Sequence, residues 1–180
     1  MRFIGGMLQE KESVLGINGS GALGTDNSRT YFVGSTIEYT PIKPLTLSAS
    51  YYYGRSQTGK TNSIISFSDV LSDSFAFDVR YQMDNEKLFG LQFASPLRIK
   101  KGKAYFNIPT GRDSYSDTVY YDTMKVGLKP MAREYDLGFY FRNQQKDYNW
   151  RGEFMARFNP DHISGIKPDY RLMFGSNFDY

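Results

Sequence analysis

The chain has 180 residues, with 22 Lys and Arg against 19 Asp and Glu, and this net charge of +3 gives no support for nucleic-acid binding. It has no Cys, which excludes a disulfide framework, a thiol nucleophile and a cysteine zinc site. Its 15 Tyr, 14 Phe and 17 Gly favour strands and turns, since aromatic rings pack well on pleated surfaces and Gly allows tight bends.

Taken in chain order, the first half of the sequence predicts a series of short strands. A Gly-rich first strand is expected near residues 12–22, followed by "TYFVGSTIEYT", "LTLSASYYYG", "NSIISFS" and "SFAFDVRYQM". Turn signals separate them, among them "TPIKP" and "GRSQTGKTN". In the strand around Asp78, apolar and polar residues alternate, which is the period of two of a strand with two unlike faces.

The second half continues the pattern more strongly. Strands are expected at "EKLFGLQFAS", "KAYFNIP", "YYDTMKVGLK", "REYDLGFYFRNQ", "YNWRGEFMARFN" and the terminal "DYRLMFGSNFDY". The intervening "QMDNEK", "KKGK", "PTGRDSYSD", "NQQKD" and "NPDHISGIKPD" are expected turns or loops, and the basic run "RIKKGK" is interpreted as a basic turn. No apolar stretch reaches the roughly 20 residues that a membrane helix needs.

Two sets of side chains result from this alternation. The polar set is expected to face an enclosed wet interior: Asp78, Arg80, Lys125, Asp136, Arg142, Arg151, Glu153, Arg157, Arg171 and Asp179. The apolar set is expected to face lipid: Phe75, Phe77, Leu137, Phe139, Phe141, Trp150, Phe154, Phe158, Leu172 and Phe174. Large rings on nearly every strand are typical of a membrane barrel with aromatic girdles.

The predicted fold class is therefore all-β: an antiparallel up-and-down transmembrane β-barrel of about 10–12 strands, with residues 1–180 as one domain. Closing such a barrel requires the last strand to pair with the first, because an open edge in lipid leaves backbone groups without partners. An export signal is expected to lie outside this sequence. The interior charges are interpreted as salt-bridge ladders that fill a narrow barrel or as the lining of a channel.

From about residue 86 onward, the chain resembles the C-terminal β-barrel, or translocator, of subtilisin-like serine protease autotransporters of Gram-negative bacteria, and three segments carry the resemblance. They are "GLQFASPLRIKKGKAYFNIPTGRD", "VGLKPMAREYDLGF" and "FNPDHISGIKPDYRL". The residues that carry the resemblance are Pro96, Leu97, Arg98, Gly102, Pro109, Leu128, Pro130, Arg133, Glu134, Asn159, Pro160, His162, Pro168 and Tyr170.

The resemblance implies a twelve-stranded outer-membrane barrel that anchors and exports a protease passenger by type V secretion. It implies three partners: outer-membrane lipid, the outer-membrane barrel assembly machinery, and an upstream protease passenger. Phe178 and Tyr180 would belong to the signal that the assembly machinery reads. The strand count falls one or two short of twelve, so one or two N-terminal strands are expected to be missing.

No enzymatic role and no cofactor is predicted, because the family's protease domain is absent from the sequence. The single histidine, His162, is interpreted as a hydrogen-bonding loop residue, with a catalytic base at a barrel mouth as the alternative. "GRSQTGKT" fits a phosphate-loop spacing, but the following "NSIISFSDV" predicts a strand where a phosphate loop requires a helix. A passive porin-like or structural barrel and a soluble carbohydrate-binding sandwich remain as further alternatives.

Overall fold

The computed structural model describes residues 1–11, 13–14, 17–18, 27–59, 64–145 and 148–178. These residues form β-strands, connecting segments and one short 3₁₀ helix, η2 (Pro160–His162). No helix among them is long and apolar enough to span a membrane.

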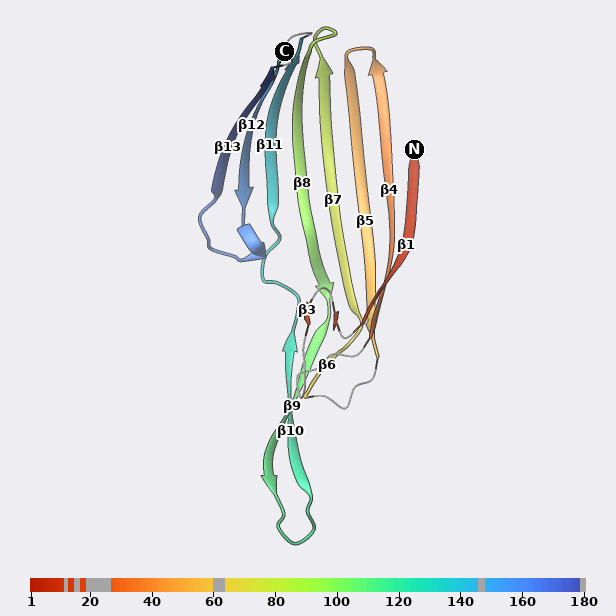
Figure 1. Cartoon of the computed structure of the whole chain (residues 1–180), viewed down its shortest axis with the longest axis vertical. Helices are drawn as coiled ribbons and strands as arrows, with labels where there is room; N and C mark the ends of the chain where they lie inside the picture. Colours follow the sequence, from red (N-terminus) through yellow and green to blue (C-terminus); the bar gives the residue numbers. More distant parts are fainter. Residues whose placement is uncertain (12, 15–16, 19–26, 60–63, 146–147, 179–180) are drawn as a thin grey trace.

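Eight strands form one antiparallel sheet in the order β1-β4-β5-β7-β8-β11-β12-β13, so that the strands of this sheet follow one another in chain order (Figure 1). Their bounds are β1 (Arg2–Glu10), β4 (Ser28–Ile42), β5 (Leu45–Thr58), β7 (Val70–Gln82), β8 (Lys87–Lys101), β11 (Tyr135–Gln144), β12 (Tyr148–Phe158) and β13 (Asp169–Phe178). The all-β antiparallel meander predicted from the alternating pattern is confirmed.

The connections at the two ends of this sheet differ in length. At one end, residues 43–44, 83–86 and 145–147 join neighbouring strands directly. At the other end, the connections contain more residues: 11–27, 59–69, 102–134 and 159–168. We call these the short-turn end and the long-loop end. The predicted turns "TPIKP" and "QMDNEK" coincide with the short-turn end, and so does the described part of "NQQKD", whose Lys146 and Asp147 lie outside the described residues.

The longest connection extends away from the sheet as an arm. It contains β9 (Lys103–Arg112) and β10 (Val119–Gly127), and β6 (Ile65–Phe67) from the 59–69 connection pairs with β9, which gives a three-stranded sheet in the order β10-β9-β6. Figure 1 shows β9 continuing downward from β8. The prediction of a basic turn at "RIKKGK" is therefore wrong: the chain passes through Gly102 from one strand into the next, and it reverses at residues 113–118. A smaller pair is formed by β2 (Ser13–Val14) and β3 (Ile17–Asn18).

The main sheet is open, and this corrects the expectation of a seam between the last and first strands. Within the described residues, β1 pairs with β4 and β13 pairs with β12, and no pairing joins β1 to β13. The physical reason lies in the arm, because the segments 65–67, 103–112 and 119–127, predicted as strands of the barrel, pair with one another instead. Eight strands, not ten to twelve, remain in the main sheet.

A carboxylate organises the turn at residues 83–86. Asp84 Oδ1 accepts hydrogen bonds from the backbone N–H groups of Glu86 at 2.9 Å and Lys87 at 2.7 Å. The hydrogen bond from Glu86 is the largest cause that holds the pKa of Asp84 below its ordinary value of 3.8. A pKa lowered by folding stabilises the turn above the unfolded-state pKa, and this stabilisation is lost as the pH falls through the folded-state pKa.

We therefore expect an NMR titration of the Asp84 carboxyl group to show a midpoint below 3.8, with the Glu86 amide signal shifting over the same pH range. Asp84→Asn should abolish that linked shift of the amide while keeping a side-chain acceptor. A midpoint at or above 3.8 would show that the turn is not organised by the carboxylate.

Candidate functional site

One face of the eight-stranded sheet is apolar and aromatic. The register places all ten side chains of the predicted lipid-facing set on this face, which we call the aromatic face. Rings meet between neighbouring strands: Phe89 and Phe141 lie 4.5 Å apart, and Phe141 and Trp150 lie 4.6 Å apart between centroids. Phe93 stacks on Tyr135 at 5.7 Å. These contacts run along the sheet and not between two stacked sheets.

The aromatic face is uncovered. Phe77 is 50% exposed, Phe139 is 47% exposed and Leu172 is 81% exposed. Among the described residues, the buried apolar side chains are only Val70, Ala104 and Ala156. A domain of ordinary size in water buries far more of its apolar side chains than this. The sheet therefore has no conventional hydrophobic core.

Charged residues mark where the apolar band of this face ends. On β5, the residues from Leu45 to Tyr53 that point to the aromatic face carry no charge, and Arg55 is the first that does. On β7 and β8 the first charges at the long-loop end are Asp73 and Arg98, which pair with each other in the register.

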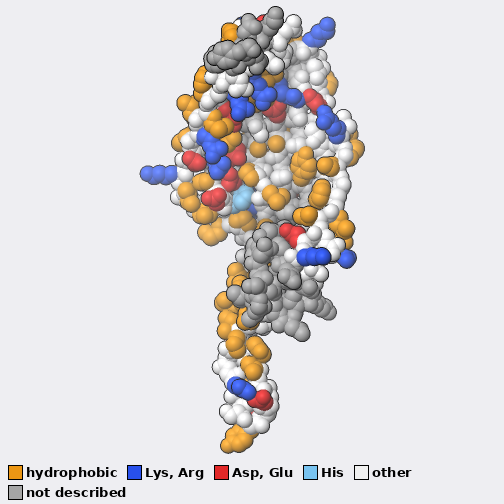
Figure 2. Space-filling model, viewed as in Figure 1, with side chains coloured by type: hydrophobic (Ala, Val, Ile, Leu, Met, Phe, Trp, Pro, Cys, Tyr) orange, Lys and Arg blue, Asp and Glu red, His pale blue; other side chains and the backbone are white. Residues whose placement is uncertain are grey.

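The opposite face carries most of the charged side chains and is called the polar face. Eight of the ten residues predicted to face the interior share it: Asp78, Arg80, Asp136, Arg142, Arg151, Glu153, Arg157 and Arg171. Figure 2 looks into the hollow of the sheet, where Lys, Arg, Asp and Glu side chains gather. Lys125 lies in β10 of the arm, away from this face, and Asp179 lies outside the described residues.

A network of ion pairs and a hydrogen bond joins side chains of three strands, β4, β7 and β11, across the polar face. Arg80 on β7 contacts Glu38 on β4 at 2.7 Å and Asp78 at 3.0 Å. The hydroxyl of Tyr140 on β11 donates to Asp78 at 2.9 Å. Glu38 and Tyr140 were not among the predicted interior residues, although the alternation in their own strands places them on this face.

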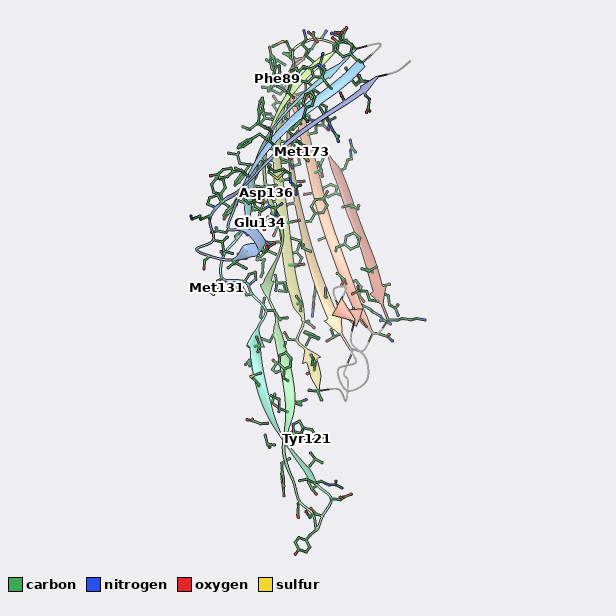
Figure 3. The ribbon with its side chains drawn as sticks, turned by 60° about the vertical axis from the view of Figure 1, so that its left-hand side comes forward. Phe89, Tyr121, Met131, Glu134, Asp136 and Met173 are labelled. Atoms are coloured by element: carbon green, nitrogen blue, oxygen red, sulfur yellow. The ribbon has the colours of Figure 1, made fainter. Side chains whose placement is uncertain are left out.

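A second network lies where β11 begins. Arg157 Nε on β12 contacts Glu134 at 3.0 Å and Asp136 at 3.5 Å, so that one guanidinium serves two carboxylates. Figure 3 shows Glu134 and Asp136 following one another along the start of β11, with Met131 farther toward the arm. Glu134 is buried, and its carboxylate also accepts the backbone N–H of Asp161 at 2.7 Å.

Arg142 and Arg151 occupy directly opposed positions on β11 and β12. No ion pair joins either of them to a carboxylate in the part of the chain that the structure describes. They help to line a cavity of about 280 Å³ together with Asp78, Tyr140 and Glu153. Like charges opposed across a strand pair are destabilising, and here the carboxylates of Asp78 and Glu153 in the same cavity offset the two arginines.

Aromatic rings on the polar face lie over glycines of the adjacent strand. A Cβ built on Gly90 would lie 2.0 Å from Cζ of Tyr140, and one built on Gly34 would lie 2.2 Å from Cδ1 of Tyr52. Gly6 is covered in the same way by the ring of Phe32. Rings placed over strand glycines fill the space of the missing side chains and fix the register of the pairing.

His162 joins three segments at the long-loop end. Its Nδ1 accepts the backbone N–H of Glu134 at 2.9 Å, which assigns the proton to Nε2, 3.0 Å from the carbonyl oxygen of Leu97 on β8. Its backbone oxygen accepts from the N–H of Ala132 at 3.1 Å. Both ring nitrogens are occupied by the backbone, as the interpretation as a loop residue predicts, and neither is available as a catalytic base in this arrangement.

Replacing His162 with Ala should therefore loosen the long-loop end. Loss of both side-chain hydrogen bonds leaves the N–H of Glu134 and the carbonyl of Leu97 without partners, and we expect a cost of about 1–3 kcal/mol. Hydrogen exchange at the Glu134 amide should accelerate. Ile166→Ala, in the same loop at an exposed position, is the matched control and should leave this amide protected. Equal exchange in the two variants would show that His162 does not hold the segments together.

The described residues of the segment with phosphate-loop spacing, residues 54–61, do not form a phosphate-binding loop. Gly54 to Thr58 lie inside β5, and Gly54 pairs with Phe32 and Ser72 of the neighbouring strands. A strand presents no cradle of N–H groups at a helix N-terminus. Lys60 and Thr61 lie outside the described residues. In the described part of the chain no three His, Asp or Glu side chains come close enough together to hold a metal ion.

The predicted assembly signal is placed only in part. Phe178 is the last residue of β13 and pairs through its backbone with Tyr148 at the short-turn end, whereas Tyr180 lies outside the described residues.

No protein-family model, no curated protein and no solved structure matches the chain.

Proposed function

We propose that this chain is an outer-membrane β-barrel protein of a Gram-negative bacterium, with its aromatic face against hydrocarbon and its polar face around a hydrated interior. The observation that carries the proposal is the uncovered aromatic face. It spans the eight-stranded sheet, and its large rings, such as Phe77 and Phe139, stay about half exposed. Monomers in water rarely expose such an extended apolar surface, and lipid is the solvent that suits it.

The dimensions of the apolar band support this proposal. The uncharged stretch on β5 runs from Leu45 to Tyr53. At about 3.3 Å per residue this stretch is about 30 Å long. A strand tilted in the bilayer needs about 9–11 residues to cross the hydrocarbon. The charges at Arg55, Asp73 and Arg98 would then lie where the band meets the headgroups.

The asymmetry of the connections supports it further. Bacterial outer-membrane barrels have short turns on the periplasmic side and longer loops on the extracellular side. The two ends of this sheet differ in the same sense. The proposal therefore orients residues 43–44, 83–86 and 145–147 toward the periplasm and the arm toward the cell exterior.

Insertion into lipid demands partners for both edges of the sheet. Unpaired backbone groups of β1 and β13 would each cost several kcal/mol in hydrocarbon. The proposal therefore includes closure of the sheet in the membrane, with both edge strands paired. The ion-pair networks of Arg80 and Arg157 would then lie inside, where charges are partnered.

We further propose the specific role of a translocator that anchors and exports a subtilisin-like protease passenger. Its support is the resemblance of the three segments from residue 90 onward. No catalysis is assigned to this chain. A porin-like barrel is the second candidate, favoured by the polar hollow with the opposed Arg142 and Arg151, which would line a pore.

The test has two stages. The chain refolded in detergent or liposomes should be protected from protease, and its gel migration should change on heating. A chain that stays monomeric in water without detergent would contradict the membrane assignment. In the second stage, a reporter joined upstream and directed to the periplasm should become accessible to protease on intact cells. Membrane insertion with the reporter kept in the periplasm, together with steady single-channel conductance, would favour the porin-like candidate.

A further inference from the structure

Four basic residues surround one carboxylate on the aromatic face at the long-loop end. Arg98, Lys100, Lys129 and Arg133, with Asp73 and Tyr135, line a surface cavity of about 420 Å³. We call the four cations the basic cluster. Two of them, Arg98 and Lys100, belong to the segment "RIKKGK".

Asp73 holds part of the basic cluster in place. It is 4% exposed, forms an ion pair with Arg133, and lies 3.5 Å from Lys100 Nζ. The hydroxyl of Tyr51 donates at 3.4 Å to Asp73 Oδ2, the same oxygen that Lys100 Nζ approaches. The guanidinium of Arg133 lies over the ring of Phe75, 5.3 Å from the centroid. Arg133 is thus fixed between a buried carboxylate and an aromatic ring.

The remaining positive charge is not neutralised by the described residues that line the cavity. Arg98 donates to the carbonyl oxygen of Pro130 at 3.3 Å, which satisfies a hydrogen bond without cancelling a charge. The Nε atoms of Arg98 and Arg133 are buried and have no acceptor in the described part of the chain. Lys100 is half exposed and Lys129 is exposed, so both ammonium groups can reach a ligand. Four cations around one carboxylate leave an anion-binding surface.

The location of the cluster specifies the kind of anion. It begins where the aromatic rows of Phe75, Phe93 and Tyr135 end, so a ligand there would have a charged group at the cavity and apolar chains along the rings. Phosphate suits this donor set, since planar guanidinium groups bind its oxygens in pairs and ammonium groups add charge. Basic pockets at the membrane surface recognise phosphate-bearing headgroups in this way.

We propose that the basic cluster binds the phosphate of a lipid headgroup at the long-loop boundary of the aromatic face. This inference rests on the proposed function, because it requires the aromatic face to lie in a membrane. Asp73 is a positioning residue: it orients Arg133 and Lys100 and would not itself contact the phosphate.

The experiment uses the full chain refolded in maltoside micelles, which contain no phosphate. Phosphatidic acid, phosphatidylcholine and inorganic phosphate are titrated separately, and binding is followed by calorimetry and native mass spectrometry. We expect phosphatidic acid to bind at least tenfold more tightly than inorganic phosphate. The double variant Lys100→Gln/Lys129→Gln should weaken phosphatidic acid binding about twenty-five-fold, at about a factor of five for each lysine.

Lys43→Gln/Lys167→Gln removes the same charge from exposed positions that do not line the cavity and should keep full affinity. Heat-modifiable migration of each variant is checked first, because a chain that never inserts refutes the proposed function. An inserted chain whose Lys100→Gln/Lys129→Gln variant binds as tightly as the unchanged chain overturns the lipid site alone. Equal affinities for inorganic phosphate and phosphatidic acid would also overturn it, since they would indicate a soluble anion as the ligand.

Discussion

Replacing Phe139 with Arg should lower the free energy of unfolding of the membrane-inserted protein by about 2–4 kcal/mol, the cost of a cation near the bilayer midplane. Phe139 lies in the middle of the aromatic face, between Leu91 on β8 and Phe154 on β12. Denaturant unfolding from lipid vesicles measures the change. In water the same substitution at a residue that is 47% exposed would be nearly neutral or would improve solubility, so the two environments give opposite expectations.

Gln92→Arg is the matched control for this substitution. Gln92 follows Leu91 on β8 but lies on the polar face, paired with Asp78 on β7. A cation beside that carboxylate should change stability by less than about 1 kcal/mol. Equal losses in the two variants, or no loss for Phe139→Arg, would contradict the assignment of the two faces.

Gly90→Ala should also lower the free energy of unfolding, in this case through a change on the polar face. The added methyl would lie 2.0 Å from Cζ of Tyr140, so the ring has to move and its hydroxyl loses the hydrogen bond to Asp78. Loss of a hydrogen bond to a charged group costs about 1.5–3 kcal/mol. The unfolding experiment described for Phe139 measures this loss.

Gly152→Ala provides the comparison, because a Cβ on Gly152 meets nothing within 4 Å. A strand Gly replaced by Ala without a clash should be neutral or gain a few tenths of a kcal/mol up to about 1 kcal/mol. In a Tyr140→Phe background the cost of Gly90→Ala should shrink, since the hydrogen bond is already gone. A cost that is unchanged in this background would show that the Tyr140 hydroxyl is not what the methyl disturbs.

The division into two faces could be predicted from the sequence because alternation is a local property. From Tyr135 to Arg142, every second residue is apolar or aromatic, and the residues between them are Asp136, Gly138, Tyr140 and Arg142. The register places these two sets on the two expected faces. The same reasoning fails at β1, for which no strand was predicted. Gly5 and Gly6 interrupt the pattern there, and pairing with β4 supplies the structure that the local sequence does not indicate.

The arm and the open edges could not be predicted because strand pairing is a long-range property. Lys125 occupies a polar position in the alternating pattern of its strand, as an interior residue of a barrel should. That strand nevertheless pairs with β9, outside the main sheet. The "RIKKGK" segment was interpreted as a turn on its composition, whereas Arg98 to Lys101 lie in β8 and bring two cations beside Asp73. Only the register of β7 with β8, including two bulges near Asp73, brings Asp73 and Arg98 together.

The most direct test concerns the side chains from Leu137 to Arg142, one at a time. The chain has no Cys, so single Cys substitutions can carry a spin label without removing native thiols. In lipid vesicles, labels at 137, 139 and 141 should be relaxed by oxygen, which concentrates in hydrocarbon, and labels at 138, 140 and 142 by a water-soluble nickel complex. Strong relaxation by nickel at 137, 139 and 141 would show that the rings meet water, and would contradict the membrane assignment.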